Sequence, residues 1–169
     1  MENHRKIRFP LEPDSDGYPP VGAESLWAYE CEPGLYSVDN IPFYVKGISS
    51  GDIVAADVYD GMLEFQQLVR PSENSVFRLI LQNVTDVQKA RDSFRQLGCS
   101  TELSNIPGLF SLEIPGSVPF EPVAALLDAG LESGRWEYEE GVLRHPIPQS
   151  PPNKNGSNLE IPNRSRSFP

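Results

Sequence analysis

The chain has 169 residues, 38% of them hydrophobic, which is enough apolar material for one ordinary domain or two very small ones. Lysine and arginine number 14 against 24 aspartates and glutamates, so the formal net charge is -10. Residues 146–169 hold three cations and one anion, a balance of +2, so residues 1–145 alone carry -12. A body this acidic repels a phosphate backbone, which argues against general nucleic-acid binding.

Cysteine and histidine are scarce. Cys31 and Cys99 stand alone in the sequence, and His4 and His145 lie near the ends of the expected folded body, where we expect solvated side chains. We therefore expect no zinc site and no other cofactor. The first residues lack the apolar stretch of a secretion signal, and no apolar run is long enough to span a membrane. We expect a cytoplasmic protein with free thiols.

The first 70 residues predict a small β subdomain. Asp60-Gly61 between two strand-like runs is typical of a tight hairpin, because both turn positions need positive φ. Several short strands within so few residues predict a small antiparallel sheet or a half-barrel. The strand-like runs are Lys6–Leu11, Ser25–Cys31, Leu35–Val38, Ile41–Val45, Asp52–Tyr59 and Met62–Val69.

Residues 71–145 show a different pattern, in which strands and helices alternate. Apolar residues spaced by three and four after a cap at Thr85 predict one helix, and a second helix is predicted from Pro119 or Pro122 to Gly134. The predicted strands are Val76–Gln82, Cys99–Leu103, Leu109–Ile114 and Arg135–Glu139. The order is β-α-β-β-α-β, that of a ferredoxin-like unit, so the fold class predicted for the whole chain is α+β.

The last segment, residues 146–169, contains 6 of the 17 prolines and no apolar periodicity. This composition predicts a disordered tail, and the alternative is a docking arm that becomes ordered on a partner. The predicted organisation is therefore a β subdomain (1–70), a ferredoxin-like subdomain (71–145) and a disordered tail (146–169).

Residue types that carry catalysis are poorly represented. Histidine is nearly absent, and neither cysteine has a neighbouring cation in the sequence that would activate its thiol. The segment Lys46–Asp52 is rich in glycine and serine but lacks the spacing of a phosphate-binding loop, so it is predicted to be a structural turn. We expect no enzymatic activity. The alternative is a hydrolase that uses carboxylates of Asp57, Asp60 or the strand Glu137–Glu140.

Two acidic stretches are candidate contacts for a partner. Aromatic and acidic residues alternate in Trp136–Glu140, which predicts a strand with its even-numbered face buried and its odd-numbered carboxylates in solvent. Such a strand offers a docking edge to a basic partner. Asp57 and Asp60 flank the end of the predicted hairpin. The candidate partner-binding residues are Glu137, Glu139, Glu140, Asp57, Asp60 and Trp136.

A longer block of the sequence resembles a bacterial domain family of unknown function. The pattern is Leu-Trp-Ala at 26–28, Val-Asp-Asn-Ile-Pro-Phe at 38–43 and Gly-Ile-Ser-x-Gly-Asp-x-Val at 47–54, and the resemblance covers roughly residues 6–140. Relatives often carry Ser-Gly-His where this chain has Ser72-Glu73-Asn74, so a role for that histidine does not transfer. The resemblance implies a bacterial, cytoplasmic context and no established activity or catalytic residues.

These observations favour a non-catalytic interaction protein: a small acidic partner, of the immunity or inhibitor type, for a basic bacterial protein such as a toxin. An anionic surface attracts a cationic partner and speeds its association. The alternative is a ligand-sensing regulatory module, since ferredoxin-like units often pair their sheets and bind small molecules between them.

Overall fold

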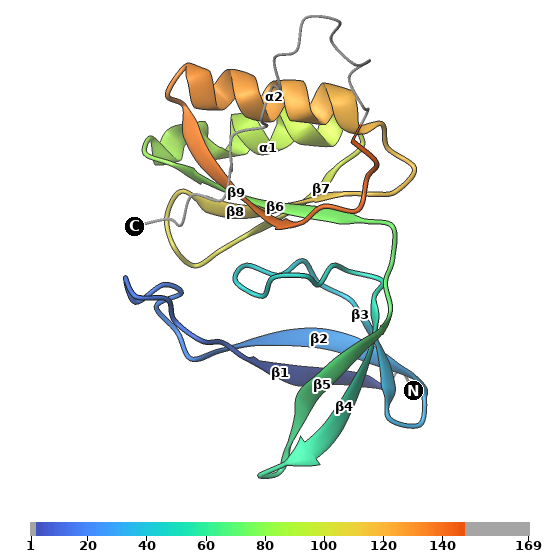
Figure 1. Ribbon diagram of the computed structural model, residues 1–169. Helices are drawn as coiled ribbons and strands as arrows, with labels where there is room; N and C mark the ends of the chain where they lie inside the picture. Colours follow the sequence, from blue (N-terminus) through green and yellow to red (C-terminus); the bar gives the residue numbers. More distant parts are fainter. Residues whose placement is uncertain (1–2, 148–169) are drawn as a thin grey trace, which may run out of the picture.

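A closed five-stranded barrel forms the first half of the chain in the computed structural model, which describes residues 3–147 (Figure 1). Neighbouring strands are antiparallel, except that β1 pairs with β5 in parallel, Ile7 opposite Leu63. This parallel pair closes the barrel. The sequence predicted only a small antiparallel sheet or a half-barrel, because pairing between strands far apart in the chain leaves no local signal. The strands are β1 His4–Pro10, β2 Ala23–Glu32, β3 Leu35–Val38, β4 Ile53–Tyr59 and β5 Met62–Arg70.

The predicted hairpin at Asp60-Gly61 is confirmed. Both residues have positive φ, 50° and 77°, as a two-residue turn between twisted strands requires. The predicted strand Ile41–Val45 is wrong, since these residues belong to the connection between β3 and β4. Three backbone amides of that segment donate to one carboxylate instead of to a neighbouring strand.

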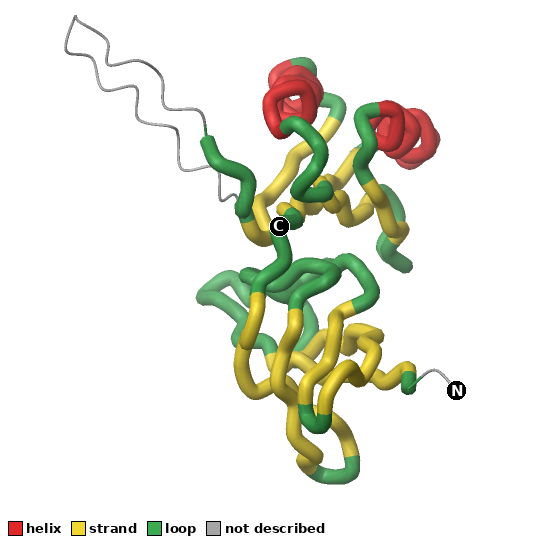
Figure 2. The backbone as a smooth tube through the Cα atoms, turned by 90° about the vertical axis from the view of Figure 1, so that its right-hand side faces the viewer, coloured by secondary structure: helices red, strands yellow, loops and turns green. Residues whose placement is uncertain are grey.

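The second half is a four-stranded antiparallel sheet with the strand order β7-β8-β6-β9. The predicted order of strands and helices is confirmed, and the chain is an α+β protein. Both helices lie on one face of this sheet (Figures 1 and 2). The elements are β6 Ser75–Leu81, a 3-10 turn Val84–Asp86, α1 Val87–Gln96, β7 Ser100–Leu103, β8 Leu109–Ile114, α2 Phe120–Glu132 and β9 Trp136–Val142.

The two helices cover the apolar face of the sheet. The predicted stripe of α1 is confirmed, with Val87, Ala90 and Phe94 buried against the strands. The cap differs from the prediction: the Asn83 side chain accepts from the Thr85 amide and starts the 3-10 turn that precedes α1. An asparagine oxygen satisfies an amide at a helix start as well as a threonine oxygen does, so the turn begins two residues earlier.

The opposite face of the sheet is turned toward the barrel, and the β3–β4 connection, residues 39–52, runs between them (Figures 1 and 2). Each half has its own apolar cluster, one inside the barrel and one between sheet and helices. Buried polar side chains lie on the barrel-facing side of the sheet: Arg78, Ser111, Glu113 and Glu139. A polar layer therefore joins two separate hydrophobic cores.

Most of the predicted disordered tail, residues 148–169, lies outside the described residues. Within residues 3–147, neither helix has the length and apolarity needed to cross a membrane.

Candidate functional site

The β9 strand does not offer the row of solvent-facing carboxylates that its alternation predicted. Trp136 is buried against the helices, and its indole N–H donates to the Leu127 carbonyl at 3.0 Å. The indole ring packs closely on Gly130, so that a Cβ atom added at Gly130 would lie 1.9 Å from the ring. The prediction that Trp136 contacts a partner is therefore wrong, because α2 already covers the indole.

Glu139 is also buried and cannot contact a partner protein from this position, since only 1% of its surface is exposed. The barrel covers it from the odd-numbered face of β9. Its Oε1 lies 3.7 Å from Arg78 Nη1 and accepts from the Tyr18 hydroxyl at 3.3 Å. Burial raises the pKa of Glu139, an effect that the Arg78 charge opposes. Of the three predicted β9 carboxylates, Glu137 is half-buried and Glu140 is exposed.

The end of the β4–β5 hairpin keeps both predicted carboxylates in solvent. Asp57 and Asp60 are exposed, and the three apolar side chains between and beside them are exposed too. Val58 is 74% exposed, Tyr59 67% and Met62 53%. We call the segment from Asp57 to Met62 the hairpin tip.

The strand registers explain why the hairpin tip is uncovered. The short strand β3 pairs with β4 only at residues 53–55, and β1 pairs with β5 only at residues 63 and 64. Beyond these positions the two strands of the hairpin have only each other as strand partners, and they project from the barrel at the end away from the sheet (Figure 1). The two aspartates were predicted from the sequence as partner contacts, but the apolar residues Val58, Tyr59 and Met62, which stand directly beside the turn, were not.

The structure does not bring the two acidic stretches together. The hairpin tip lies at the far end of the barrel, and Glu137–Glu140 belongs to the sheet on the other side of the β3–β4 connection (Figure 1). The two stretches therefore do not contribute carboxylates to one common site.

The β3–β4 connection is held in place by carboxylates. Glu24 on β2 accepts from the amides of Phe43, Tyr44 and Val45 at 2.6–2.8 Å. From the sheet side, Arg78 donates to the Val45 carbonyl and Glu102 accepts from the Ile41 amide at 3.1 Å. Charged acceptors and donors make stronger hydrogen bonds than neutral ones, so a connection without regular structure is fixed between barrel and sheet.

The segment Lys46–Asp52 forms the centre of the barrel–sheet junction, and it contains a turn, as predicted. Asp52 is fully buried and accepts from the amides of Ser49 (3.0 Å) and Ser72 (2.8 Å). Arg144, just after β9, donates to both Asp52 oxygens. Burial alone would raise the pKa of Asp52, but the bonds from Arg144 and the two amides hold it below its ordinary value.

A second contact of the same turn involves Ser50. Its amide and hydroxyl donate to the Glu113 carboxylate at 3.0 and 2.6 Å, and burial raises the pKa of Glu113. Asn74 donates to the Ser50 carbonyl at 3.0 Å and accepts from the Gly116 amide at 3.1 Å. The Asn74 side-chain amide therefore bridges the two halves.

Of the histidines and cysteines, His145 and Cys99 are buried, whereas His4 and Cys31 are exposed. His145 is buried, not solvated as expected, and its Nδ1 lies 2.7 Å from the hydroxyl of Ser75, which is fully buried. Its Nε2 contacts the carbonyls of Pro115 and Val118, so the pair is enclosed by backbone. Burial raises the pKa of the Cys99 thiol to about 11. Among the described residues, no three His, Cys, Asp or Glu side chains form a group that could hold a metal ion.

The comparisons with known proteins agree with this architecture. Residues 24–138 match the family described as "Domain of unknown function (DUF4265)". A crystal structure of a hypothetical protein from Neisseria gonorrhoeae is similar, with a TM-score of 0.68 and 19% identity over 85% of this chain and 96% of that chain. At this identity the likeness concerns the fold. No curated protein matches the chain.

Proposed function

We propose that this chain, which belongs to the family of the domain of unknown function DUF4265, is a non-catalytic interaction protein that binds a basic bacterial protein through its hairpin tip. The observation that carries the proposal is the exposure of Val58 and Tyr59 between the carboxylates of Asp57 and Asp60, and of Met62 just beyond them. Tyrosine and methionine are enriched in protein interfaces, where a few such anchors supply most of the binding energy.

Charge supports a basic partner. The body carries -12 over residues 1–145, and the two aspartates place negative charge beside the apolar anchors. Rim charges of this kind speed association with a cationic surface and disfavour acidic partners. An immunity or inhibitor protein works in this way, because it covers a site on its partner without making or breaking a bond.

The architecture suits a rigid support for such a contact. We infer a β subdomain (1–70) and a ferredoxin-like subdomain (71–145), on the basis of the two separate apolar clusters and of the strand order β7-β8-β6-β9 with both helices on one face. The polar junction joins them through Asp52 and Arg144, so the hairpin extends from one rigid body. We infer that the protein acts in the cytoplasm.

The first experiment is capture from a lysate of the source organism, with the chain as bait and the captured proteins identified by mass spectrometry. The wild type should retain a protein of high isoelectric point, and the double variant Tyr59→Ser/Met62→Ser should lose it. The double variant Val84→Ser/Leu103→Ser removes apolar side chains of similar exposure elsewhere and should retain it. A basic partner held equally by the Tyr59→Ser/Met62→Ser bait would contradict the proposal.

The second experiment isolates the contribution of charge. Asp57→Asn/Asp60→Asn removes two charges from the hairpin tip, and asparagine tolerates the positive φ of position 60. Association with the captured partner should slow in this variant and become less sensitive to salt. Glu121→Gln/Glu132→Gln removes two exposed charges from α2 and should leave the rate close to that of the wild type. Equal rates for both double variants would remove the electrostatic part of the proposal.

A further inference from the structure

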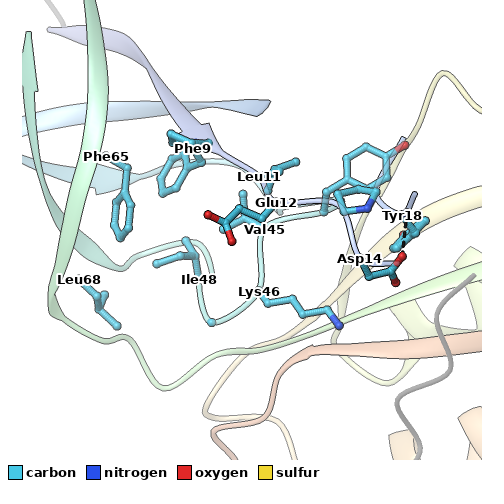
Figure 3. Close-up of a pocket in the computed structure, with 14 residues that line it drawn as sticks. Phe9, Leu11, Glu12, Asp14, Tyr18, Val45, Lys46, Ile48, Phe65 and Leu68 are labelled. Carbon is cyan, nitrogen blue, oxygen red and sulfur yellow. Dashed lines mark hydrogen bonds between the residues drawn. The ribbon is translucent and has the colours of Figure 1, made fainter. Parts of the chain in front are cut away.

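A pocket of about 550 Å³ lies where the β1–β2 connection, the β3–β4 connection and the barrel meet (Figure 3). Its volume is within the range of small-molecule sites in proteins. It lies outside the hairpin tip, so an occupant of this pocket would be independent of the proposed protein partner.

One end of the pocket is apolar. The rings of Phe9 and Phe65 stack with their centroids 4.7 Å apart, and Ile48 and Leu68 lie beside them in Figure 3. Phe9 and Ile48 are buried parts of the barrel core, whereas Leu68 is exposed. This end presents a fixed apolar surface that can cover a hydrocarbon or aromatic group.

The other end carries charges of both signs. Lys46, Asp14 and Tyr18 lie together on this side in Figure 3, and Glu12 lies between the two ends. Within residues 3–147, Lys46 forms no ion pair. The Asp14 carboxylate accepts from the amides of Asp16 and Tyr18 at 2.9 and 3.0 Å, so its position is fixed by the turn.

Buried groups hold the charged end of the pocket in place. Tyr18 and Val45 both line the pocket, and both are tied to the sheet: the Tyr18 hydroxyl donates to Glu139, and Arg78 donates to the Val45 carbonyl. Arg78 and Glu139 are almost completely buried. The Tyr18 side chain and the Val45 backbone are therefore held in place before a ligand binds, which lowers the entropy lost on binding at this wall.

We propose that this pocket binds a small zwitterion with an apolar side chain, the chemical class of an apolar amino acid or a dipeptide. Lys46 pairs with the ligand carboxylate, Asp14 and Glu12 pair with its ammonium group, and the apolar side chain lies on Phe9 and Phe65. An anion with an apolar tail would meet two carboxylates beside one lysine, and an amine without a carboxylate would leave Lys46 without a counter-charge in the pocket.

Isothermal titration calorimetry with purified full-length protein tests the ligand class. The probes are L-leucyl-L-phenylalanine and free L-phenylalanine, which separate the dipeptide from the amino acid. N-acetyl-leucyl-phenylalanine and leucyl-phenylalanine amide each lack one of the two charges. At least one zwitterion should bind, and its analogues without the ammonium or the carboxylate should bind about tenfold more weakly. The proposal would be overturned if neither zwitterion binds at concentrations up to roughly 5 mM. It would also be overturned if the analogues that lack one charge bind as tightly as the zwitterion.

Variants test the assigned side chains. Lys46→Gln should weaken zwitterion binding about tenfold and should not weaken binding of the amide analogue, which has no carboxylate to pair with Lys46. Glu12→Gln should weaken binding of the zwitterion and not of the N-acetyl analogue. Both residues are exposed, and Lys89→Gln on α1 is the matched control that should bind as the wild type does. Tyr59→Ser/Met62→Ser should also bind normally, so failure of the hairpin contact and failure of this site are distinguishable. Unchanged zwitterion affinity in Lys46→Gln would refute the assignment.

Discussion

Replacing Arg144 by alanine should weaken the barrel–sheet junction. Arg144 donates to both oxygens of Asp52, to the Ser49 hydroxyl and to the carbonyls of Gly47 and Ser72. Asp52 is fully buried, so the variant leaves a carboxylate without its cation in the interior. Removing one member of a buried pair costs about 3–5 kcal/mol.

The expected loss lies at the lower end of that range, about 3 kcal/mol, because the amides of Ser49 and Ser72 and the Ser49 hydroxyl still donate to Asp52. For a folded body of this size the melting temperature should fall by about 6–12 °C. Urea denaturation followed by circular dichroism measures the change in the free energy of unfolding. Asp52→Asn should cost less than Arg144→Ala, because the arginine keeps its contacts to two carbonyls.

The double variant Asp52→Asn/Arg144→Ala gives the coupling between the two side chains. Its loss should fall short of the sum of the single losses by about 1–2 kcal/mol, since the second substitution removes a partner that is already lost. Arg70→Ala is the control: Arg70 forms an exposed ion pair with Glu32 at 3.5 Å, and its loss should cost less than about 1 kcal/mol. Additive losses, or an Arg144→Ala variant as stable as Arg70→Ala, would refute this account of the junction.

Three further predictions concern stability. Burial raises the pKa of three carboxyl groups above their unfolded value of 4.5, so the stability that they contribute is fully present below pH 4.5 and is lost as pH rises through their folded values. The three groups are Glu102, Glu113 and Glu139. The urea midpoint should therefore be higher at pH 5 than at pH 7.5, and Glu113→Gln should reduce the difference. A urea midpoint that is lower at pH 5 than at pH 7.5 would contradict this. Gly130→Ala should destabilise the fold by about 1–3 kcal/mol, because the new methyl group meets the Trp136 ring, and an unchanged urea midpoint would count against this packing. Gly61→Ala should destabilise the fold by about 1–2 kcal/mol, because φ is +77° at this position. Gly22 has no positive φ and no atom within 4 Å of a new Cβ, so Gly22→Ala should lower the melting temperature less. Equal decreases in the two variants would argue against the turn geometry.

Local signals in the sequence were sufficient for the hairpin and the helices. Asp60-Gly61 predicts its turn because two adjacent positions with positive φ admit few residues, and the spacing from Val87 to Phe94 predicts the buried face of α1. Both features depend only on residues close together in the chain. Closure of the barrel depends on β1 pairing with β5, more than 50 residues away, and no local pattern encodes that pair.

The sequence pattern placed Glu139 in solvent, whereas the structure buries it. Alternation of aromatic and acidic residues is the same whether the acidic face of β9 meets solvent or another polar surface of the protein. The available signal was Arg78, a charge among the apolar residues of strand β6, which indicates a buried anion opposite it. In the structure that anion is Glu139. The exposed apolar residues of the hairpin tip escaped prediction because the length of β3 decides whether they are covered.

Site-specific photo-crosslinking in the source organism tests the central claim most directly. A photoreactive amino acid placed at position 59 in the hairpin tip should form one dominant crosslinked product, with a protein of high isoelectric point. The same group at position 84, which is also exposed, should not capture that protein. Crosslinks of equal yield from both positions, or a dominant acidic protein at position 59, would contradict a function based on the hairpin tip and a basic partner.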